Sequence, residues 1–316
     1  MQENFSVLKN YGEDLTSRVY VTDPAIARDE ELKKLMMVLL TPEKSGLLVG
    51  KAGVGKTSIV EGLSYRILNG TVPNGLKGFK VIKINSSSLL SKIALNGREE
   101  MVITLLIGEL MNTEKTILFI DEIHTLIGAG NTANLDLANM LKPAIDRGAI
   151  KLIGATTDIE YNTYVIRDRA FLRRFEKIEV PEPSEATTVE ILFKSLPKIE
   201  KSTGIKFRYN EYVTKMLLES IVSATSEYKR VYGLGAMYPD IAFSVLTAAF
   251  SQALFQNREF VTTLDVYNAI KTSKRIYPDS IIRELAAFRE KFKDVVVQEG
   301  IQLPIVTIEE INSAEN

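Results

Sequence analysis

The spacing of apolar residues changes once along this chain, and the change predicts two structural parts. Up to residue 180, helical patterns alternate with short apolar runs, which lie at residues 46–50, 80–85, 116–121, 151–156 and 177–180. Because strands that are joined by helices run parallel in one sheet, this alternation predicts an α/β domain with a parallel central sheet covered by helices. One of the helical patterns, at residues 28–41, has leucine and methionine at intervals of three and four positions.

Beyond Pro181 the strand signals stop, and the remaining apolar residues follow helical stripes. The clearest stripes are Val213, Met216, Leu217 and Ile221, and then Ile241, Val245, Leu246, Ala249 and Phe250. Residues 262–265, TTLD, resemble a capping box that opens another helix. We therefore expect an α/β domain at 1–182 with a helical extension at about 1–27, an all-helical domain at 183–300, and a loosely ordered tail at 301–316.

A last helix is predicted at about 280–298. Its apolar residues are four and three positions apart, at Ile281, Leu285, Phe288, Phe292 and Val295. Such a stripe packs against the core of its own domain or, alternatively, lies in a groove of another chain.

Composition and charge exclude several classes of function. The 316 residues are 45% hydrophobic and 25% charged, as in ordinary globular proteins, and the formal net charge of −1 gives no indication of nucleic-acid binding. The absence of cysteine excludes disulfides, thiol nucleophiles and cysteine-ligated metals. The polar start is not a signal peptide, and no apolar run reaches the roughly 18 residues of a membrane span. We expect a cytoplasmic protein without a membrane partner.

Residues 50–57, GKAGVGKT, match the phosphate-binding pattern G-x-x-x-x-G-K-[ST] between a predicted strand and a predicted helix. The glycines allow backbone N–H groups to surround phosphate oxygens, and the start of the helix adds its dipole. Lys56 is expected to neutralise the β- and γ-phosphates, and Thr57 to bind Mg²⁺. The predicted ATP-binding residues are thus Gly50, Lys51, Ala52, Gly53, Val54, Gly55, Lys56 and Thr57.

A second motif supplies the groups that hydrolysis requires. Residues 117–122, ILFIDE, form an apolar strand that ends in two carboxylates. Asp121 is expected to hold Mg²⁺ together with Thr57, and Glu122 to polarise the attacking water. Because phosphoryl transfer depends mostly on positioning and charge neutralisation, these groups suffice to predict an ATPase.

Further motifs occur in the order found in a known family. They are YGEDLT and ARDEE before the glycine-rich loop, VEGLSYRI and NGTVPNGLKG after it, and then IDEIH, GAG, NMLKPA, GATT and LRRFEKIEVPEPS. In this set, residues 11–275 resemble the first ATPase module of Clp-family AAA+ unfoldases and disaggregases. The resemblance implies an αβα P-loop domain with a helical lid, and a homo-oligomeric ring, most often of six subunits.

The resemblance also implies roles for single residues. Thr157 of GATT matches the sensor that lies beside the γ-phosphate, and Ile26 matches a position near the adenine. Arg173 and Arg174 match the arginine fingers, which reach the nucleotide of a neighbouring subunit and stabilise transition-state charge there. Without the family context, the arginine pair would be interpreted as a solvated surface pair.

Three positions depart from the family pattern. In the loop that grips polypeptide, Leu95 and Asn96 occupy the places of an aromatic and a basic residue, with Gly97 aligned. Leucine lacks the flat face of an aromatic ring, so Leu95 either forms a weaker hydrophobic grip or packs locally. In the lid, Ile241 follows Tyr238-Pro239-Asp240 where the family has lysine.

Two features are expected to have no direct chemical role. The Ile107–Gly108 pair lies in a predicted helix, so we expect no loop that docks a peptidase ring. His124, the sole histidine, cannot form a metal site alone, and we interpret it as a structural residue or as support for a neighbouring site residue.

The leading hypothesis is an ATP-driven ring that remodels a protein or protein complex. Because 316 residues leave no room for a separate substrate domain or a second ATPase module, we expect a stand-alone module that depends on an unidentified protein substrate or adaptor. The alternative is an ATP-gated scaffold or loader, assembling as a ring or filament on a partner protein or DNA without threading polypeptide. A regulatory subunit without turnover is disfavoured by the complete set of Lys56, Asp121, Glu122, Thr157 and both arginines.

Overall fold

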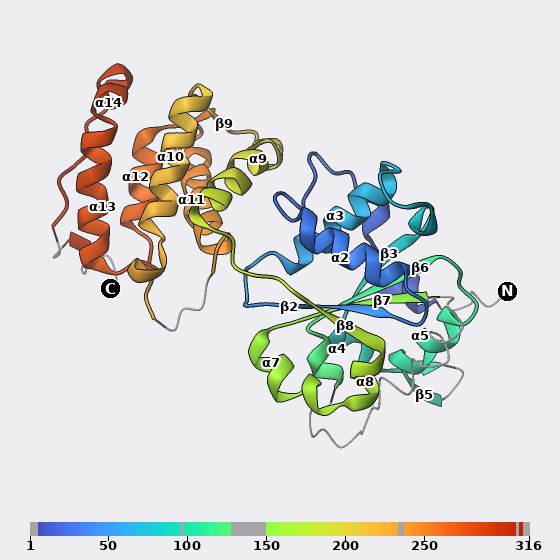
Figure 1. Ribbon diagram of the computed structural model, residues 1–316. Coiled ribbons are helices and arrows are strands. Elements are labelled where there is room, and N and C mark those ends of the chain that lie inside the picture. Colours follow the sequence, from blue (N-terminus) through green and yellow to red (C-terminus); the bar gives the residue numbers. More distant parts are fainter. Residues whose placement is uncertain (1–5, 96–97, 128–149, 233–236, 308–309, 312–316) are drawn as a thin grey trace. The chain divides into compact units, whose positions relative to one another are not determined.

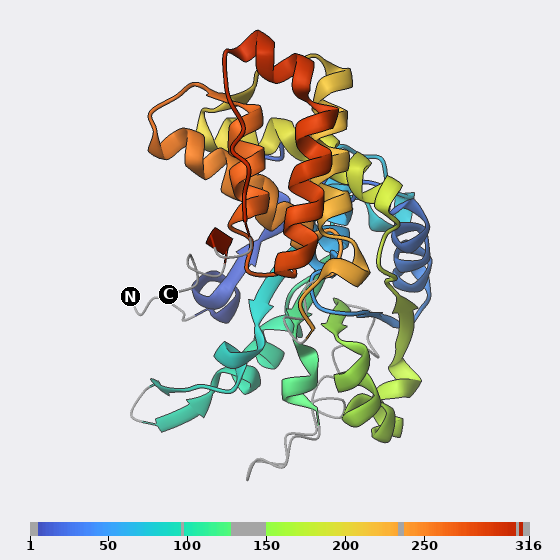
Figure 2. The ribbon, with the colours of Figure 1, turned by 90° about the vertical axis from the view of Figure 1, so that its left-hand side faces the viewer.

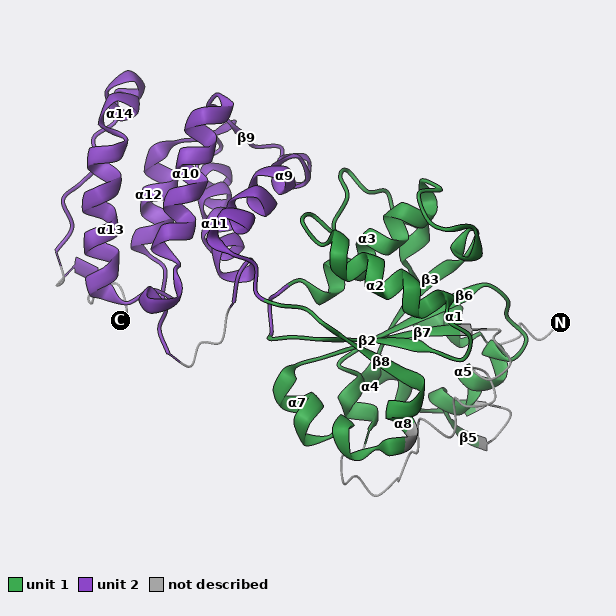
Figure 3. Cartoon of the chain, in the orientation of Figure 1, with its two compact units in different colours: residues 1–51, 55–181 green, residues 52–54, 182–316 purple. Residues whose placement is uncertain are grey.

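The computed structural model describes residues 6–95, 98–127, 150–232, 237–307 and 310–311. The chain divides into two compact units (Figure 3). Unit 1 comprises Met1–Lys51 and Gly55–Pro181, and unit 2 comprises Ala52–Val54 and Glu182–Asn316. Among the described residues, no helix has the length and apolar character needed to cross a membrane.

Unit 1 is built on a central sheet, which has six strands among the described residues, in the order β1-β3-β6-β7-β2-β8. All neighbouring strands run parallel except β1, which is antiparallel to β3. The strands are β1 (Gly12–Asp14), β2 (Ser45–Val49), β3 (Lys80–Asn85), β6 (Thr116–Asp121), β7 (Ile150–Thr156) and β8 (Phe175–Glu179). The predicted parallel sheet is therefore confirmed.

Helices cover both faces of this sheet, which gives the αβα layers (Figure 1). Helices α2 and α3 lie on one face, and α4, α5, α7 and α8 lie on the other. The helices of unit 1 are α1 (Val7–Tyr11), α2 (Asp29–Leu40), α3 (Lys56–Leu68), α4 (Ser86–Leu89), α5 (Val102–Leu110), α7 (Asp158–Thr163) and α8 (Arg169–Arg174). Short 3₁₀ turns lie at η1 (Leu15–Ser17), η2 (Asn74–Leu76), η3 (Ile123–Leu126) and η4 (Val165–Arg167). Alternate strand residues such as Leu47 and Val49 are buried in one core with Leu106 and Phe171.

Two segments of unit 1 differ from the prediction. The extension at about 1–27 is not simply helical, because the five-residue α1 is followed by β1, which pairs with the otherwise open edge of β3. A three-residue strand is too short to give a recognisable period. The segment between α4 and α5 contains an antiparallel hairpin of β4 (Lys92–Leu95) and β5 (Arg98–Met101), which is visible in Figure 2.

Unit 2 is mainly helical, as predicted, with one small addition. Its helices are α9 (Glu185–Thr203), α10 (Glu211–Ala224), α11 (Asp240–Phe255), α12 (Thr263–Lys271), α13 (Pro278–Lys291) and α14 (Lys293–Glu299), with a 3₁₀ turn η5 (Glu227–Lys229). The capping box at the start of α12 is present as predicted, between Thr262 and Asp265. Two strands of two residues, β9 (Lys206–Phe207) and β10 (Phe260–Val261), pair in parallel, so the expectation of an all-helical part is wrong at this point.

The predicted last helix is divided into α13 and α14 at Phe292, whose φ and ψ of −109° and 12° leave the helical region. The Phe292 ring is fully buried and lies 4.3 Å from the Phe288 ring, centroid to centroid. The stripe that begins at Ile281 belongs to the core of unit 2. Of the two interpretations of this stripe, packing within its own domain is confirmed.

The tail beyond Gly300 is packed where the structure describes it, contrary to our expectation. The side chains of Val306 and Ile311 are buried in the core of unit 2. The Tyr267 hydroxyl donates a hydrogen bond of 2.6 Å to the Pro304 carbonyl. The tail was expected to be loose because isolated apolar residues in a polar segment give no periodic signal.

We expect Tyr267→Phe to loosen this tail. Removing the hydroxyl deletes one hydrogen bond and leaves the Pro304 carbonyl without this donor, which should lower the stability of unit 2 by about 1 kcal/mol. The measurements are the urea midpoint and the rate of proteolytic cleavage after residue 300. Tyr212→Phe, at a side chain that is 72% exposed, is the matched control. Equal cleavage of wild type and Tyr267→Phe would show that this bond does not hold the tail.

Candidate functional site

The loop between β2 and α3 holds the glycine-rich motif in a conformation that larger residues do not readily adopt. The Gly50 N–H donates to the Thr156 carbonyl at 3.3 Å, and a Cβ at Gly50 would lie 2.2 Å from the Val180 carbonyl oxygen. Gly53 and Gly55 have positive φ angles of 82° and 99°, which glycine adopts without steric cost. Helix α3 begins after Gly55 without a side-chain N-cap, so its first N–H groups can bind an anion.

The Lys56 side chain turns back onto this loop. Its Nζ donates to the carbonyls of Gly50 at 2.6 Å and Lys51 at 3.0 Å. Burial lowers the pKa of Lys56, and the nearby carboxylates, first among them Asp121, act against that shift. The loop therefore brings a cation and the first N–H groups of α3 to one place, which is what a chain of phosphates requires.

The Thr57 hydroxyl and the Asp121 carboxylate meet beside the loop, although 64 residues separate them. Thr57 Oγ1 donates to Asp121 Oδ2 at 3.2 Å, and Asp121 Oδ1 accepts from the Glu122 N–H at 3.1 Å. Lys83 Nζ lies 4.0 Å from Asp121 Oδ2. Lys83 was not predicted as a site residue. It could have been noticed as a charged residue inside the apolar run of β3.

Glu122 has a left-handed backbone, with φ of 52° and ψ of 42°. Its carbonyl accepts from both the N–H and the hydroxyl of Thr125, each at 3.0 Å. Such a conformation costs about 1–3 kcal/mol for a residue other than glycine and persists where the surroundings hold it in place. The carboxylate itself is exposed.

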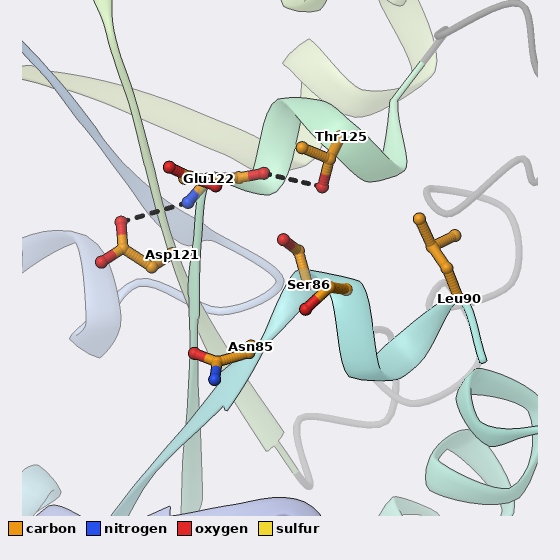
Figure 4. A pocket seen from close by; sticks show the side chains of 7 residues that line it. Asn85, Ser86, Leu90, Asp121, Glu122 and Thr125 are labelled. Carbon is orange, nitrogen blue, oxygen red and sulfur yellow. Dashed lines mark hydrogen bonds between the residues drawn. The ribbon is translucent and has the colours of Figure 1, made fainter.

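A pocket of about 440 Å³ opens beside this carboxylate (Figure 4). Asp121 and Glu122 line it from the end of β6, and Asn85 and Ser86 line it from the end of β3 and the start of α4. The pocket is completed by Ser87, Leu90 and Thr125. Space for solvent and small molecules is therefore present next to the predicted catalytic carboxylate, Glu122.

Thr157 lies at the same edge of the sheet, where it caps helix α7. Its Oγ1 accepts from the Glu160 N–H at 3.3 Å, and Glu160 Oε2 accepts from the Thr157 N–H at 2.9 Å. Burial alone would raise the pKa of Glu160, but hydrogen bonds from Thr157, the charge of His124 and the Thr156 hydroxyl outweigh it and lower that pKa. Glu160 is the second site residue that was not predicted. A carboxylate three residues after a threonine is the pattern of a capping box, and this pattern could have identified it.

The structure places the other predicted residues in separate segments. Arg173 and Arg174 form the last turn of α8, which packs on β8 through the stacked rings of Phe171 and Phe175, with centroids 3.8 Å apart. The Arg173 side chain is exposed and that of Arg174 is half-buried. Ile26 is half-buried in the turn before α2. The structure thus brings Lys56, Thr57, Asp121, Glu122 and Thr157 to one edge of the sheet, and the roles of the arginines and Ile26 stay predictions.

The positions that depart from the family pattern lie outside this edge of the sheet. Leu95 ends strand β4, and Asn96 and Gly97 lie outside the described residues. Ile107 and Gly108 lie within α5, as predicted. In unit 2, the Ile241 side chain is 1% exposed and belongs to the core.

Comparisons with known proteins identify a family and relatives that this chain resembles. Residues 46–181 match the family described as "ATPase family associated with various cellular activities (AAA)". The chaperone protein ClpB of Pseudomonas putida is 37% identical over 256 residues, which are 79% of this chain and 29% of the relative. The motif-based resemblance is therefore confirmed.

Solved structures of Hsp104 have a similar fold. Hsp104 with ATPγS and FITC-casein has a TM-score of 0.71 and 28% identity, covering 95% of this chain and 54% of that chain. The S. cerevisiae Hsp104–ADP complex has a TM-score of 0.70 and 30% identity, covering 92% and 49%. This chain spans less than a third of the length of ClpB and about half of the Hsp104 chains.

The capping carboxylate gives a pH-dependent prediction. Because the folded state lowers the pKa of Glu160 below its ordinary value of 4.5, its contribution to stability is present above that value and is lost as the pH falls through the lower folded value. Glu160→Gln should therefore destabilise unit 1 by about 1 kcal/mol at pH 7. The difference between the urea midpoints of the two chains should narrow as the pH is lowered below about 5. A difference that is unchanged between pH 7 and pH 4 would contradict this account.

Proposed function

Since residues 46–181 belong to the AAA family of ATPases, we propose that this chain is a Mg²⁺-dependent ATPase that works in an oligomeric ring to remodel a protein or protein complex. The observation that carries the proposal is the meeting of Lys56, Thr57, Asp121, Glu122 and Thr157 at one edge of the sheet. These residues come from three separate segments of the chain, so their meeting depends on the fold. Together they supply phosphate binding, metal binding and water activation.

ATP is the proposed substrate, held by backbone N–H groups within residues 50–57, with Lys56 on its β- and γ-phosphates. In the P-loop (residues 50–57), the carbonyls of Gly50 and Lys51, which accept from Lys56 Nζ, would give way to phosphate oxygens. Ile26 is proposed to contact the adenine.

The donor set of Thr57 and Asp121 fits Mg²⁺. The hydroxyl and carboxylate oxygens lie 3.2 Å apart, and Mg²⁺ commonly takes one or two protein oxygens besides waters and substrate phosphates. In the part of the chain that the structure describes, no three acidic or histidine side chains gather into a metal site of their own. Bound Mg²⁺ would supply charge neutralisation to the phosphates, and the protein's part is to hold these two oxygens beside the loop.

Hydrolysis is proposed to need two copies of the chain. Glu122 orients the attacking water and accepts its proton, while Thr157 orders the same water near the γ-phosphate. Arg173 and Arg174 act on the nucleotide of a neighbouring subunit, since an arginine supplied in trans stabilises the charge that develops in the transition state. The proposed assembly is therefore a homo-oligomer, and we take a ring of six subunits from the family resemblance. The proposed location is the cytoplasm.

The proposed partner is a polypeptide or an adaptor that presents one. The similar protein of Pseudomonas putida is named a chaperone, and a similar Hsp104 structure contains FITC-casein. The leucine at the position of the family's aromatic grip favours the second candidate, a scaffold that ATP assembles on a partner protein or DNA without threading. Both candidate functions use the same ATPase site. They differ in whether the β4–β5 hairpin grips a polypeptide.

Glu122→Gln should bind ATP without turning it over. Removing the base lowers phosphate release by at least about 100-fold, while the groups that bind nucleotide stay intact. Native mass spectrometry with Mg²⁺–ATP should then show a stable oligomer, which can be used to capture the partner. Lys56→Ala is the matched control, because it should lose ATP binding and the ATP-dependent oligomer together. A mass that stays monomeric with ATP would refute the ring, and undiminished turnover would refute the role of Glu122.

Leu95 separates the two candidate functions. In a chain that also carries Glu122→Gln, Leu95→Ala should weaken the ATP-dependent binding of FITC-casein, and Leu95→Tyr should strengthen it by about fivefold, because an aromatic ring offers a larger contact face. Fluorescence anisotropy measures both. Casein binding that is indifferent to the residue at position 95 would favour the scaffold.

A further inference from the structure

His124 lies on η3, two residues after the predicted catalytic base Glu122, and its side chain is mostly buried. Its side chain is 14% exposed. The imidazole stacks on the ring of Tyr164, with centroids 6.1 Å apart and an interplanar angle of 18°. The ring is thus fixed in one plane by packing, so its nitrogens have defined partners.

His124 Nδ1 contacts two oxygens. It lies 3.1 Å from Glu160 Oε2 and 3.2 Å from Thr156 Oγ1. The same carboxylate oxygen also accepts from the Thr156 hydroxyl at 3.1 Å and from the Thr157 N–H at 2.9 Å. An ionised carboxylate only accepts hydrogen bonds, so the 3.1 Å contact between Nδ1 and Glu160 Oε2 is a hydrogen bond only when the hydrogen belongs to Nδ1. The network is therefore fully satisfied only with His124 as a donor.

These contacts join three segments of the nucleotide site. The Thr156 carbonyl accepts from the Gly50 N–H of the P-loop, and its side chain is in the network. Glu160 completes the capping box that fixes Thr157 at the start of α7. His124 itself is on the turn that follows Glu122. A shift of the His124 ring would consequently remove one of the three contacts that hold Glu160 Oε2 and loosen the cap that sets the position of Thr157 relative to Glu122.

We propose that His124 is a positioning residue for ATP hydrolysis, which holds Glu160 through Nδ1–H and thereby fixes Thr157 relative to Glu122. The inference rests on the proposed ATPase function. It assigns His124 no contact with nucleotide. Its contribution is to the geometry of the water-ordering groups, so it affects turnover more than binding, because catalysis depends on the alignment of reacting groups to within about 1 Å.

Two substitutions separate positioning from packing. His124→Asn places an amide donor near the position of Nδ1, whereas His124→Phe keeps the stack on Tyr164 and has no donor. We expect His124→Phe to lower kcat by about tenfold, with the Kd for a fluorescent ATP analogue within about twofold of wild type. His124→Asn should restore most of kcat. Equal kcat values for the two variants, or a loss in nucleotide affinity instead of kcat, would overturn the proposal.

A double substitution tests whether His124 acts through Glu160. If it does, His124→Phe combined with Glu160→Gln should lower kcat no more than the stronger single substitution, because both remove the same link. Multiplicative losses would show independent effects and overturn the proposal.

A third measurement does not depend on turnover. Hydrogen exchange of the amides of residues 157–164 in the nucleotide-free chain should be faster in His124→Phe than in wild type, and near wild type in His124→Asn. Exchange unaffected by His124→Phe would refute the link. If wild type shows no ATPase activity with Mg²⁺, the proposed function fails, and the exchange experiment alone decides whether His124 holds α7.

Discussion

The parallel pairing of β2, β7 and β6 is the constraint on which the rest of the site depends. Val49 of β2 lies opposite Thr156 of β7, and Ile120 of β6 lies opposite Gly154 of β7. Since parallel strands end at the same edge, this register brings the P-loop, the acidic pair and the cap of α7 together. The Gly50 N–H bond to the Thr156 carbonyl extends the pairing one residue beyond β2. A slip of one residue would turn side chains to the opposite face and separate these groups.

Several features at this edge are unfavourable for the folded chain taken alone. Glu122 has a left-handed backbone, the Lys56 ammonium is partly desolvated, and α3 starts without a side-chain cap. Proteins keep such features where a rigid scaffold holds them and a ligand relieves them. Here the proposed relief is a phosphate chain, which would satisfy Lys56 and the first N–H groups of α3 together. The unfavourable features therefore lie where the proposed chemistry needs them.

The strongly periodic elements of the fold could be predicted from the sequence, and so could the site residues that fall in dense motifs. The buried strands around Leu47 and Phe119 carry continuous apolar runs, which only a covered parallel sheet explains. By contrast, β1 is three residues long and owes its pairing to the open edge of β3, and Phe292 interrupts a helix whose apolar stripe continues through it. Tertiary contacts decide these cases, and local pattern does not contain them.

The same distinction holds within the site. Lys56, Asp121 and Glu122 could be predicted because each belongs to a short motif, whereas Lys83 and Glu160 act through partners that are distant in the sequence or through a cap. A lone histidine gave no indication of its partner, because the contact to Glu160 spans 36 residues and depends on the register of β6 and β7. Only the fold shows that His124 has its Nδ1 on a carboxylate.

Ile241 shows that a residue missing from a motif can be replaced by one from another segment of the fold. Ile241 stands where the family has a basic residue, and its side chain is in the core of unit 2. A lysine there would bury a charge, which is costly without a partner. Yet the first turn of α11 does have a cation beside it, since Arg275, from the segment between α12 and α13, lies 3.3 Å from Asp240. A motif comparison alone would count this lid turn as having lost its basic group, whereas the fold supplies one from another segment.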